Sequence, residues 1–202
     1  MKLEEIIAAV QQALGVQVDG KPGTETWSAI YQRVLGKSPN KPALPPVISP
    51  VDPRSEGVIA TLLPEVRPLA RALVHKAGSM GIRIKIISGY RTYEEQAAIY
   101  AKGRTKPGPK VTNSPPGYSN HNFGIAFDVG VFEGNSYMGE SPKYAVVGGL
   151  GTDLGLEWGG TWTSFVDQPH YQLRPEWAAD MSSKQMMAEL RTRHDDNTPV
   201  FA

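Results

Sequence analysis

The sequence predicts a mixed α+β fold that follows a small helical domain. Helices are indicated by residues 3–14 and 63–77, where apolar residues recur every three or four positions. Strands are indicated by residues 82–88 and 170–173, where apolar and polar residues alternate. Six prolines between residues 37 and 54 separate the first helical segment from the rest of the chain. We therefore expect two domains of unequal size.

Composition narrows the class of protein. The chain has 202 residues, a formal net charge of +1 and no cysteine. The balanced charge argues against a nucleic-acid binder, which depends on a basic surface. The lack of cysteine excludes disulfides, thiolate catalysis and cysteine-ligated zinc. No run approaches the roughly 20 apolar residues of a membrane span.

The N-terminus indicates where the chain is made. Glu4 and Glu5 lie where a signal peptide would have its basic and apolar regions. We therefore expect a protein that is made in the cytoplasm without a signal peptide.

Residues 1–36 are predicted to form the small helical domain. Its first helix ends at Gly15, tight turns follow at Asp19-Gly20 and Pro22-Gly23, and Thr24 begins a second helix. The segment resembles a truncated type 1 peptidoglycan-binding domain that has two of the family's three helices. The alternative is a two-helix structural cap that binds no ligand. The residues that carry the resemblance are Val10-Gln11-Gln12-Ala13-Leu14-Gly15, Asp19-Gly20, Gly23, Thr26 and Ala29-Ile30.

Residues 37–55 are predicted to be a proline-rich linker, and residues 56–202 the main domain. Proline at this density favours an extended polyproline conformation and prevents helix formation. The alternative is an ordered arm that packs on the main domain.

The first elements of the main domain bring an arginine to a corner of the chain. The helix over residues 63–77 ends before Gly78, and the strand over residues 82–88 follows. Thr92 then caps another helix, with Glu95 three positions later to complete a capping box. Arg91 lies between this strand and this helix, a placement that favours a functional role. The alternative is a buried structural ion pair.

Two histidines and an aspartate form the predicted metal site: His121, Asp128 and His170. The first two are seven positions apart, which is about 23 Å along a strand and about 10 Å along a helix. Neither arrangement suits one small ion, so we expect Gly124 to bend the chain between them. Three ligands leave the fourth position of a zinc ion open, which is typical of a catalytic site.

Asp167 is the candidate proton acceptor. Pro169 disfavours helix at the residue before it, so Asp167 and His170 are expected in an extended or turn segment. A hydrolytic site needs a group that takes a proton from water and passes it to the leaving amine. Asp167 is close in sequence to a ligand but poorly placed to bind the same ion in the same geometry.

These motifs resemble the zinc D-alanyl-D-alanine carboxypeptidase and L-alanyl-D-glutamate endopeptidase family, whose members include bacteriophage endolysins. The resemblance covers roughly residues 58–178. It implies a hedgehog/D-Ala-D-Ala peptidase-like fold, in which a small antiparallel sheet with flanking helices holds one zinc ion. The matching motifs are Ser88-Gly89-Tyr90-Arg91, Ser119-x-His121-x-x-Gly124-x-Ala126-x-Asp128, Glu157-Trp158-Gly159-Gly160 and Asp167-x-Pro169-His170.

The resemblance also implies a role for each site residue. His121, Asp128 and His170 would bind the zinc ion. Asp167 takes the position of the catalytic carboxylate, and Arg91 that of the arginine that steadies the substrate carbonyl and the oxyanion. The predicted substrate-binding residues are Ser119, Tyr90, Trp158 and Trp162, with core packing as the alternative for Trp158.

The function that the resemblance implies is cleavage of the peptide stem of peptidoglycan, with the L-alanyl-D-glutamate bond as the first choice. The alternatives are a D-alanyl-D-alanine carboxypeptidase and a non-catalytic protein that binds the cell wall. We expect a monomer whose partner is peptidoglycan and which reaches the wall after release from the cytoplasm.

Overall fold

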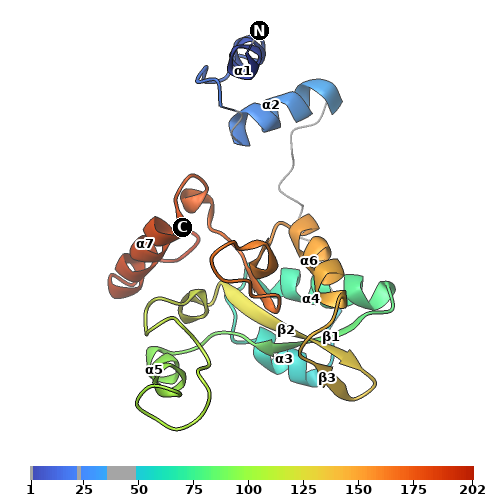
Figure 1. Ribbon diagram of the computed structural model, residues 1–202, viewed down its shortest axis with the longest axis vertical. Helices are drawn as coiled ribbons and strands as arrows, with labels where there is room; N and C mark the ends of the chain where they lie inside the picture. The colour runs from blue at the N-terminus through green and yellow to red at the C-terminus, as the bar shows by residue number, and fades with distance from the viewer. Residues whose placement is uncertain (1, 22–23, 36–48) are drawn as a thin grey trace. The chain divides into compact units, whose positions relative to one another are not determined.

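The computed structural model describes residues 2–21, 24–35 and 49–202 (Figure 1). The chain divides into two compact units, Met1–Ala43 and Leu44–Ala202. Much of the predicted linker, residues 36–48, lies outside the described residues. Residues 53–55, which the prediction placed in the linker, belong to a helix of the second unit.

The first unit is organised around a buried amide. It consists of α1 (Leu3–Leu14) and α2 (Thr24–Leu35), and Gly15 ends α1 with a φ of 72°. The Gln11 Oε1 accepts hydrogen bonds from the backbone N–H groups of Asp19 and Gly20, at 3.1 and 2.9 Å. Its Nε2 donates to the Thr26 hydroxyl at 3.0 Å. One side chain therefore ties the turn to both helices.

The second unit contains the small antiparallel sheet that the resemblance implied. Its strand order is β1-β2-β5-β4, with β3 paired to β2, and every pairing is antiparallel. This confirms the predicted α+β fold class. The strands are β1 (Arg83–Ser88), β2 (Ala126–Glu133), β3 (Ser136–Met138), β4 (Glu157–Trp158) and β5 (His170–Gln172).

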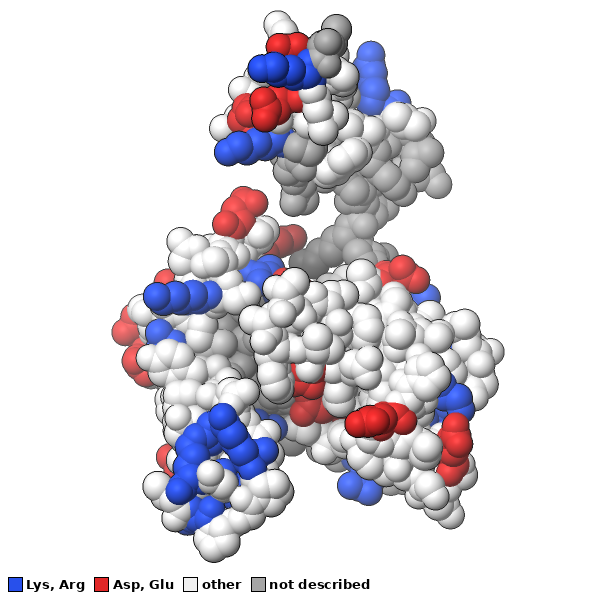
Figure 2. Space-filling view, viewed as in Figure 1, with Lys and Arg blue, Asp and Glu red and all other residues white. Residues whose placement is uncertain are grey.

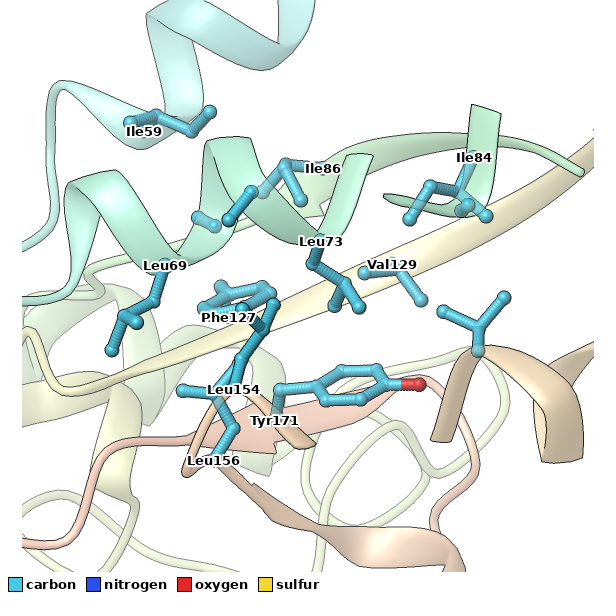
Figure 3. Close-up of a cluster of buried hydrophobic side chains, with 14 of the residues drawn as sticks. Ile59, Leu69, Leu73, Ile84, Ile86, Phe127, Val129, Leu154, Leu156 and Tyr171 are labelled. Atoms are coloured by element: carbon cyan, nitrogen blue, oxygen red, sulfur yellow. The ribbon is translucent and has the colours of Figure 1, made fainter. Parts of the chain in front are cut away.

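The main core lies between the sheet and three helices, α3 (Pro53–Ile59), α4 (Arg67–Ser79) and α6 (Lys143–Asp153). Alternate residues of β1 and β2 point into it because successive strand residues face opposite sides of a sheet. The strands contribute Ile84, Ile86, Phe127, Val129 and Tyr171, and α4 contributes Leu69 and Leu73 (Figure 3).

A second apolar cluster joins the start of β2 to the C-terminal part of the chain. Phe123 and Ile125 pack there with Met186 and Leu190 of α7 (Ser183–Asp195). The helix begins at a capping box between Ser182 and Gln185. The capping box predicted for Thr92 and Glu95 is also present, at the start of α5 (Tyr93–Ala101).

Several elements differ from the sequence expectations. The helix predicted from residue 63 begins at Arg67, and the Leu63 N–H before it donates to the Gly124 carbonyl at 3.0 Å. The helices α3 and α6 and the strands β3 and β4 were not predicted. None of the described helices has the length and hydropathy that crossing a membrane would require.

Helix α6 contains glycines that let it lie very close to the sheet. A Cβ on Gly148 would lie 2.3 Å from Trp158 Cδ2, and one on Gly151 would lie 2.5 Å from Tyr171 Cε1. No atom lies within 4 Å of the corresponding Cβ position on Gly149. The two inward glycines are therefore required by packing, and Gly149 is not.

We expect Gly148→Ala to destabilise the protein and Gly149→Ala to stabilise it. The first change forces the Trp158 ring out of place, at about 1–3 kcal/mol. The second improves helix propensity without a clash and adds up to about 1 kcal/mol. Urea unfolding of the two variants measures the difference. Equal effects of the two substitutions would contradict this account of α6.

Candidate metal centre

Three side chains that are distant in sequence converge on the floor of a cleft. Asp128 lies in the middle of the sheet, paired with Ser88 on one side and His170 on the other. Its Oδ1 lies 3.3 Å from His121 Nε2 and 3.3 Å from His170 Nδ1. Three potential ligand atoms, one from each residue, all lie within 4.8 Å of one another. Among the described residues, this is the group that could hold a metal ion.

The expected bend at Gly124 brings His121 back to Asp128. His121 belongs to η1 (Asn120–Phe123), and Gly124 follows it with a φ of 68°, a conformation that residues with a Cβ adopt rarely. Leu63 also packs against this glycine, since a Cβ there would lie 3.1 Å from Leu63 Cγ. The bend is thus fixed by both local conformation and tertiary contact.

Each histidine is oriented by its outer nitrogen. His121 Nδ1 lies 2.7 Å from the Gly89 carbonyl oxygen, and His170 Nε2 lies 3.0 Å from the Gln172 Oε1. Both partners are acceptors, so these ring nitrogens carry the hydrogen and donate it. The inner nitrogens, His121 Nε2 and His170 Nδ1, are then free to bind a metal ion.

The two separations from the Asp128 carboxylate suit a tetrahedral ion. Zinc bonds of about 2.0–2.1 Å imply ligand atoms about 3.3–3.4 Å apart along a tetrahedral edge. The two separations from Asp128 Oδ1 are both 3.3 Å. The donor set of two imidazoles and one carboxylate also matches the type that zinc uses in catalytic sites. The residues present therefore fit a zinc ion.

The electrostatics of the triad favour a charged carboxylate. Withdrawal from water alone would raise the pKa of Asp128, but His121 and His170 hold it far below its usual range. Burial alone would lower the pKa of His170, but its hydrogen bond to Asp128 raises it. Asp128 thus presents a negative charge that can be met either by protonated imidazole or by a cation.

Asp167 lines the same cleft but is not part of the triad. Its backbone is fixed on both sides, since its N–H donates to the Gly159 carbonyl and its carbonyl accepts from the His170 N–H, at 3.0 and 3.2 Å. Burial raises the pKa of Asp167, and the charge of Asp128 adds to that shift. Asp167 is therefore a carboxyl group that takes up a proton more readily than an ordinary aspartate.

Arg91 is held in place by the neighbouring strand and helix. Its Nη2 donates to the Ser88 hydroxyl at 3.0 Å, and its Nη1 donates to Gln96 Oε1 at 2.8 Å. The Arg91 N–H also donates to the His121 carbonyl at 3.0 Å, which joins this corner to the metal site. Burial lowers the pKa of the Arg91 guanidinium, although Asp128 opposes the shift.

The cleft has a volume of about 770 Å³ and brings together most of the predicted site residues. Beside the triad, Asp167 and Arg91, it is lined by Ser119 and Trp162. The Trp162 ring lies 5.0 Å from that of His170, centroid to centroid.

Two predicted substrate contacts lie elsewhere. Tyr90 is 42% exposed and is not among the residues that line the cleft. Trp158 is absent from the lining as well. It packs against Gly148, and its Nε1 donates to the Gln168 carbonyl at 2.8 Å. The placement of Trp158 matches the core-packing alternative, and neither residue is positioned as a cleft wall.

Sequence reasoning missed a hydrogen-bonded chain behind His170. Gln172 accepts from His170 and donates through Nε2 to Glu157 Oε2 at 2.6 Å, and Glu157 in turn pairs with Arg174. The alternation of residues 170–173 does place Gln172 on the same face of the strand as His170, two positions earlier. Glu157 and Arg174 carry no such indication, because their contact depends on the β4–β5 pairing.

The sheet and the His–Asp–His site together define a metallopeptidase of the zinc type. The chain belongs to the VanY family, whose model, described as D-alanyl-D-alanine carboxypeptidase, matches residues 60–145. It is 37% identical over 130 residues to the peptidoglycan L-alanyl-D-glutamate endopeptidase CwlK of Bacillus subtilis (strain 168). That alignment covers 58% of this chain and 77% of CwlK.

Two further proteins are similar at lower identity or over a smaller share of their own length. The L-alanyl-D-glutamate peptidase of Listeria phage A118 is 32% identical over 124 residues, which cover 59% of this chain and 40% of the phage protein. The crystal structure of Serratia marcescens L-Ala D-Glu endopeptidase ChiX is similar with a TM-score of 0.47 and 20% identity. It matches 63% of this chain and 92% of the ChiX chain.

We expect Gln172→Ala to weaken zinc binding about 10–100-fold, because His170 loses the acceptor that fixes its tautomer and ring orientation. Competition with a chromogenic chelator measures the affinity. Gln168→Ala is the control, since Gln168 contacts Trp158 through a backbone carbonyl that alanine retains. An affinity for Gln172→Ala equal to that of the native protein would show that Gln172 does not support His170.

Proposed function

We propose that this chain is a zinc-dependent endopeptidase that hydrolyses the L-alanyl-D-glutamate bond of bacterial peptidoglycan. The observation that carries the proposal is the triad of His121, Asp128 and His170 at the floor of a cleft that also holds Asp167. The similarity to CwlK, which covers 77% of that protein, supports the choice of bond.

The metal ion would be held by His121 Nε2, Asp128 Oδ1 and His170 Nδ1. When bound, zinc supplies a Lewis acid and lowers the pKa of water at the site. The sheet provides Asp128 and His170 from adjacent strands, so the ligand geometry is set by strand register.

Asp167 would act as the general base and then as the general acid. Its carboxylate accepts a proton from the attacking water and returns it to the nitrogen of the leaving amine. The raised pKa of Asp167 suits this task because the group must hold the proton between the two steps. Asp167 and Asp128 are two carboxyl groups whose environments shift their pKa values in opposite directions.

Arg91 would stabilise the negative charge that develops on the carbonyl oxygen of the substrate. Two of its N–H donors are used by Ser88 and Gln96, which fixes the plane of the guanidinium. Arg91 lines the cleft, and a positive charge held there before reaction needs no reorganisation as the oxyanion forms.

The identity of the bond is tested by digestion of purified muropeptides and mass spectrometry of the products. We expect cleavage of the stem after L-alanine. Treatment with a chelator should abolish the activity, and added zinc should restore it. Release of free D-alanine with the L-alanyl-D-glutamate bond intact would instead identify a D-alanyl-D-alanine carboxypeptidase. That second candidate is favoured by the description of the matching family model.

The division of roles within the cleft is tested by two substitutions. We expect Asp167→Asn to bind zinc with native affinity but to lose about 10²–10⁴-fold in kcat, because the proton acceptor is gone. His121→Ala should lose both zinc and activity, because it removes a ligand. Metal content by atomic absorption and muropeptide turnover separate the two effects. Loss of zinc from Asp167→Asn would make Asp167 a ligand.

We also propose that the first unit binds the wall and that the protein acts there after release from the cytoplasm. The resemblance to a type 1 peptidoglycan-binding domain supports this role. Trp27 of α2 is 59% exposed, and an aromatic ring in that position can stack on the apolar face of a sugar.

We expect Trp27→Ala to reduce binding to purified sacculi in a sedimentation assay while turnover of soluble muropeptides stays at the native level. The substitution removes a large exposed ring from the first unit and leaves the cleft residues intact. Val34→Ala, at an exposed position of the same helix, is the control. Native sacculus binding by Trp27→Ala would argue against Trp27 as a contact to the wall.

A further inference from the structure

The loop after α5 carries a concentration of positive charge that the mechanism does not use. Four cations, Lys102, Arg104, Lys106 and Lys110, fall within nine residues. From residue 96 to residue 127 the sequence contains no aspartate or glutamate, although the whole chain has a net charge of only +1. Figure 2 shows lysine and arginine gathered on the surface of this part of the molecule. We call residues 102–110 the cationic loop.

The cationic loop is closed by its own hydrogen bonds. The N–H groups of Arg104 and Lys106 donate to the Ala101 carbonyl at 3.1 and 2.9 Å, and the Gly103 N–H donates to the Lys106 carbonyl at 2.9 Å. Gly103 has a φ of 68°, and a Cβ there would lie 2.7 Å from the Lys110 backbone nitrogen. The charges are therefore displayed on a defined turn.

Arg104 fixes the loop to the helix before it and the segment after it. Its guanidinium stacks on the Tyr100 ring, 3.8 Å from the centroid, and its Nη2 donates to the Thr112 carbonyl at 2.9 Å. Arg104 and the three lysines are all exposed, but only Arg104 is held by these contacts. Arg104 thus serves the structure of the loop, and the three lysines are available to a ligand.

The cationic loop continues directly into the cleft. Lys110 lines the cleft, and so do the residues that follow it up to Ser114. The same cleft contains Asp167 and the metal triad. A substrate that reaches the metal site and extends along this lining therefore passes Lys110, at the end of the cationic loop.

We propose that the cationic loop binds free carboxylates of the peptide stem and so helps to select anionic substrates. This inference rests on the proposed function. Glutamate has two carboxyl groups, and continuation of the stem uses at most one of them, so a stem cut at an alanyl-glutamate bond carries free negative charge near the cleft. Lysine ammonium groups on a fixed turn attract such a substrate, and salt at 0.1 M screens the attraction beyond about 10 Å.

The test is the double variant Lys106→Glu/Lys110→Glu, which leaves the structural Arg104 intact. We expect KM for a soluble muropeptide to rise about tenfold with kcat near the native value, and the dependence of kcat/KM on salt to become weaker. The variant Lys106→Gln/Lys110→Gln should give a smaller rise. The control is Arg54→Glu/Lys76→Glu, which changes the net charge by the same amount as the test variant. These two residues lie in α3 and α4, which do not line the cleft.

The outcomes separate the possible explanations. An unchanged KM, or an equal change in the control, would overturn the proposal. Amidation of the muropeptide carboxylates should raise KM for the native protein but not for the glutamate variant. A defect seen only on sacculi that carry phosphodiester polymers would assign the loop to wall phosphate and also overturn the proposal. If the native protein cleaves no muropeptide, the proposed function fails, and binding of a labelled muropeptide still tests the loop.

Discussion

The structure of the second unit depends on the pairing of one carboxylate, Asp128, with two imidazoles. A charged group within a sheet is costly unless partners of opposite charge or a cation compensate it. The partners are His121, from the turn before Gly124, and His170, from the neighbouring strand. Gly89 and Gln172 support the two imidazole rings from behind. The bend, the β2–β5 register and the β4–β5 pairing all serve this arrangement.

Two aspartates in one cleft differ because their surroundings differ. Asp128 contacts two imidazoles and stays ionised, whereas burial raises the pKa of Asp167 and the charge of Asp128 adds to that shift. The same side-chain chemistry thus supplies a ligand and a proton carrier. Arg91 adds a positive charge to the same cleft, and its hydrogen bonds to Ser88 and Gln96 fix its orientation.

Local rules were enough to predict the elements with clear caps and periodicity, such as α1, α5 and β1. The convergence of His121 and Asp128 also followed from their awkward spacing and Gly124. Helix α6 escaped prediction because its glycines have poor helix propensity and are used for packing. The positions of Tyr90 and Trp158 and the chain from Gln172 to Arg174 depend on tertiary contacts, which periodicity cannot show.

Helix α6 also shows how residues remote from the cleft control the position of His170, a side chain of the metal site. Tyr171 packs into the space above Gly151, and its strand neighbour His170 points to the opposite face of the sheet. A larger residue at Gly151 would press on β5 from behind and shift the imidazole. A substitution far from the substrate can therefore inactivate such a protein, because its effect passes through the sheet to the metal ligands. A glycine-rich sequence that resembles a loop can thus mark a helix that packs very close to a sheet.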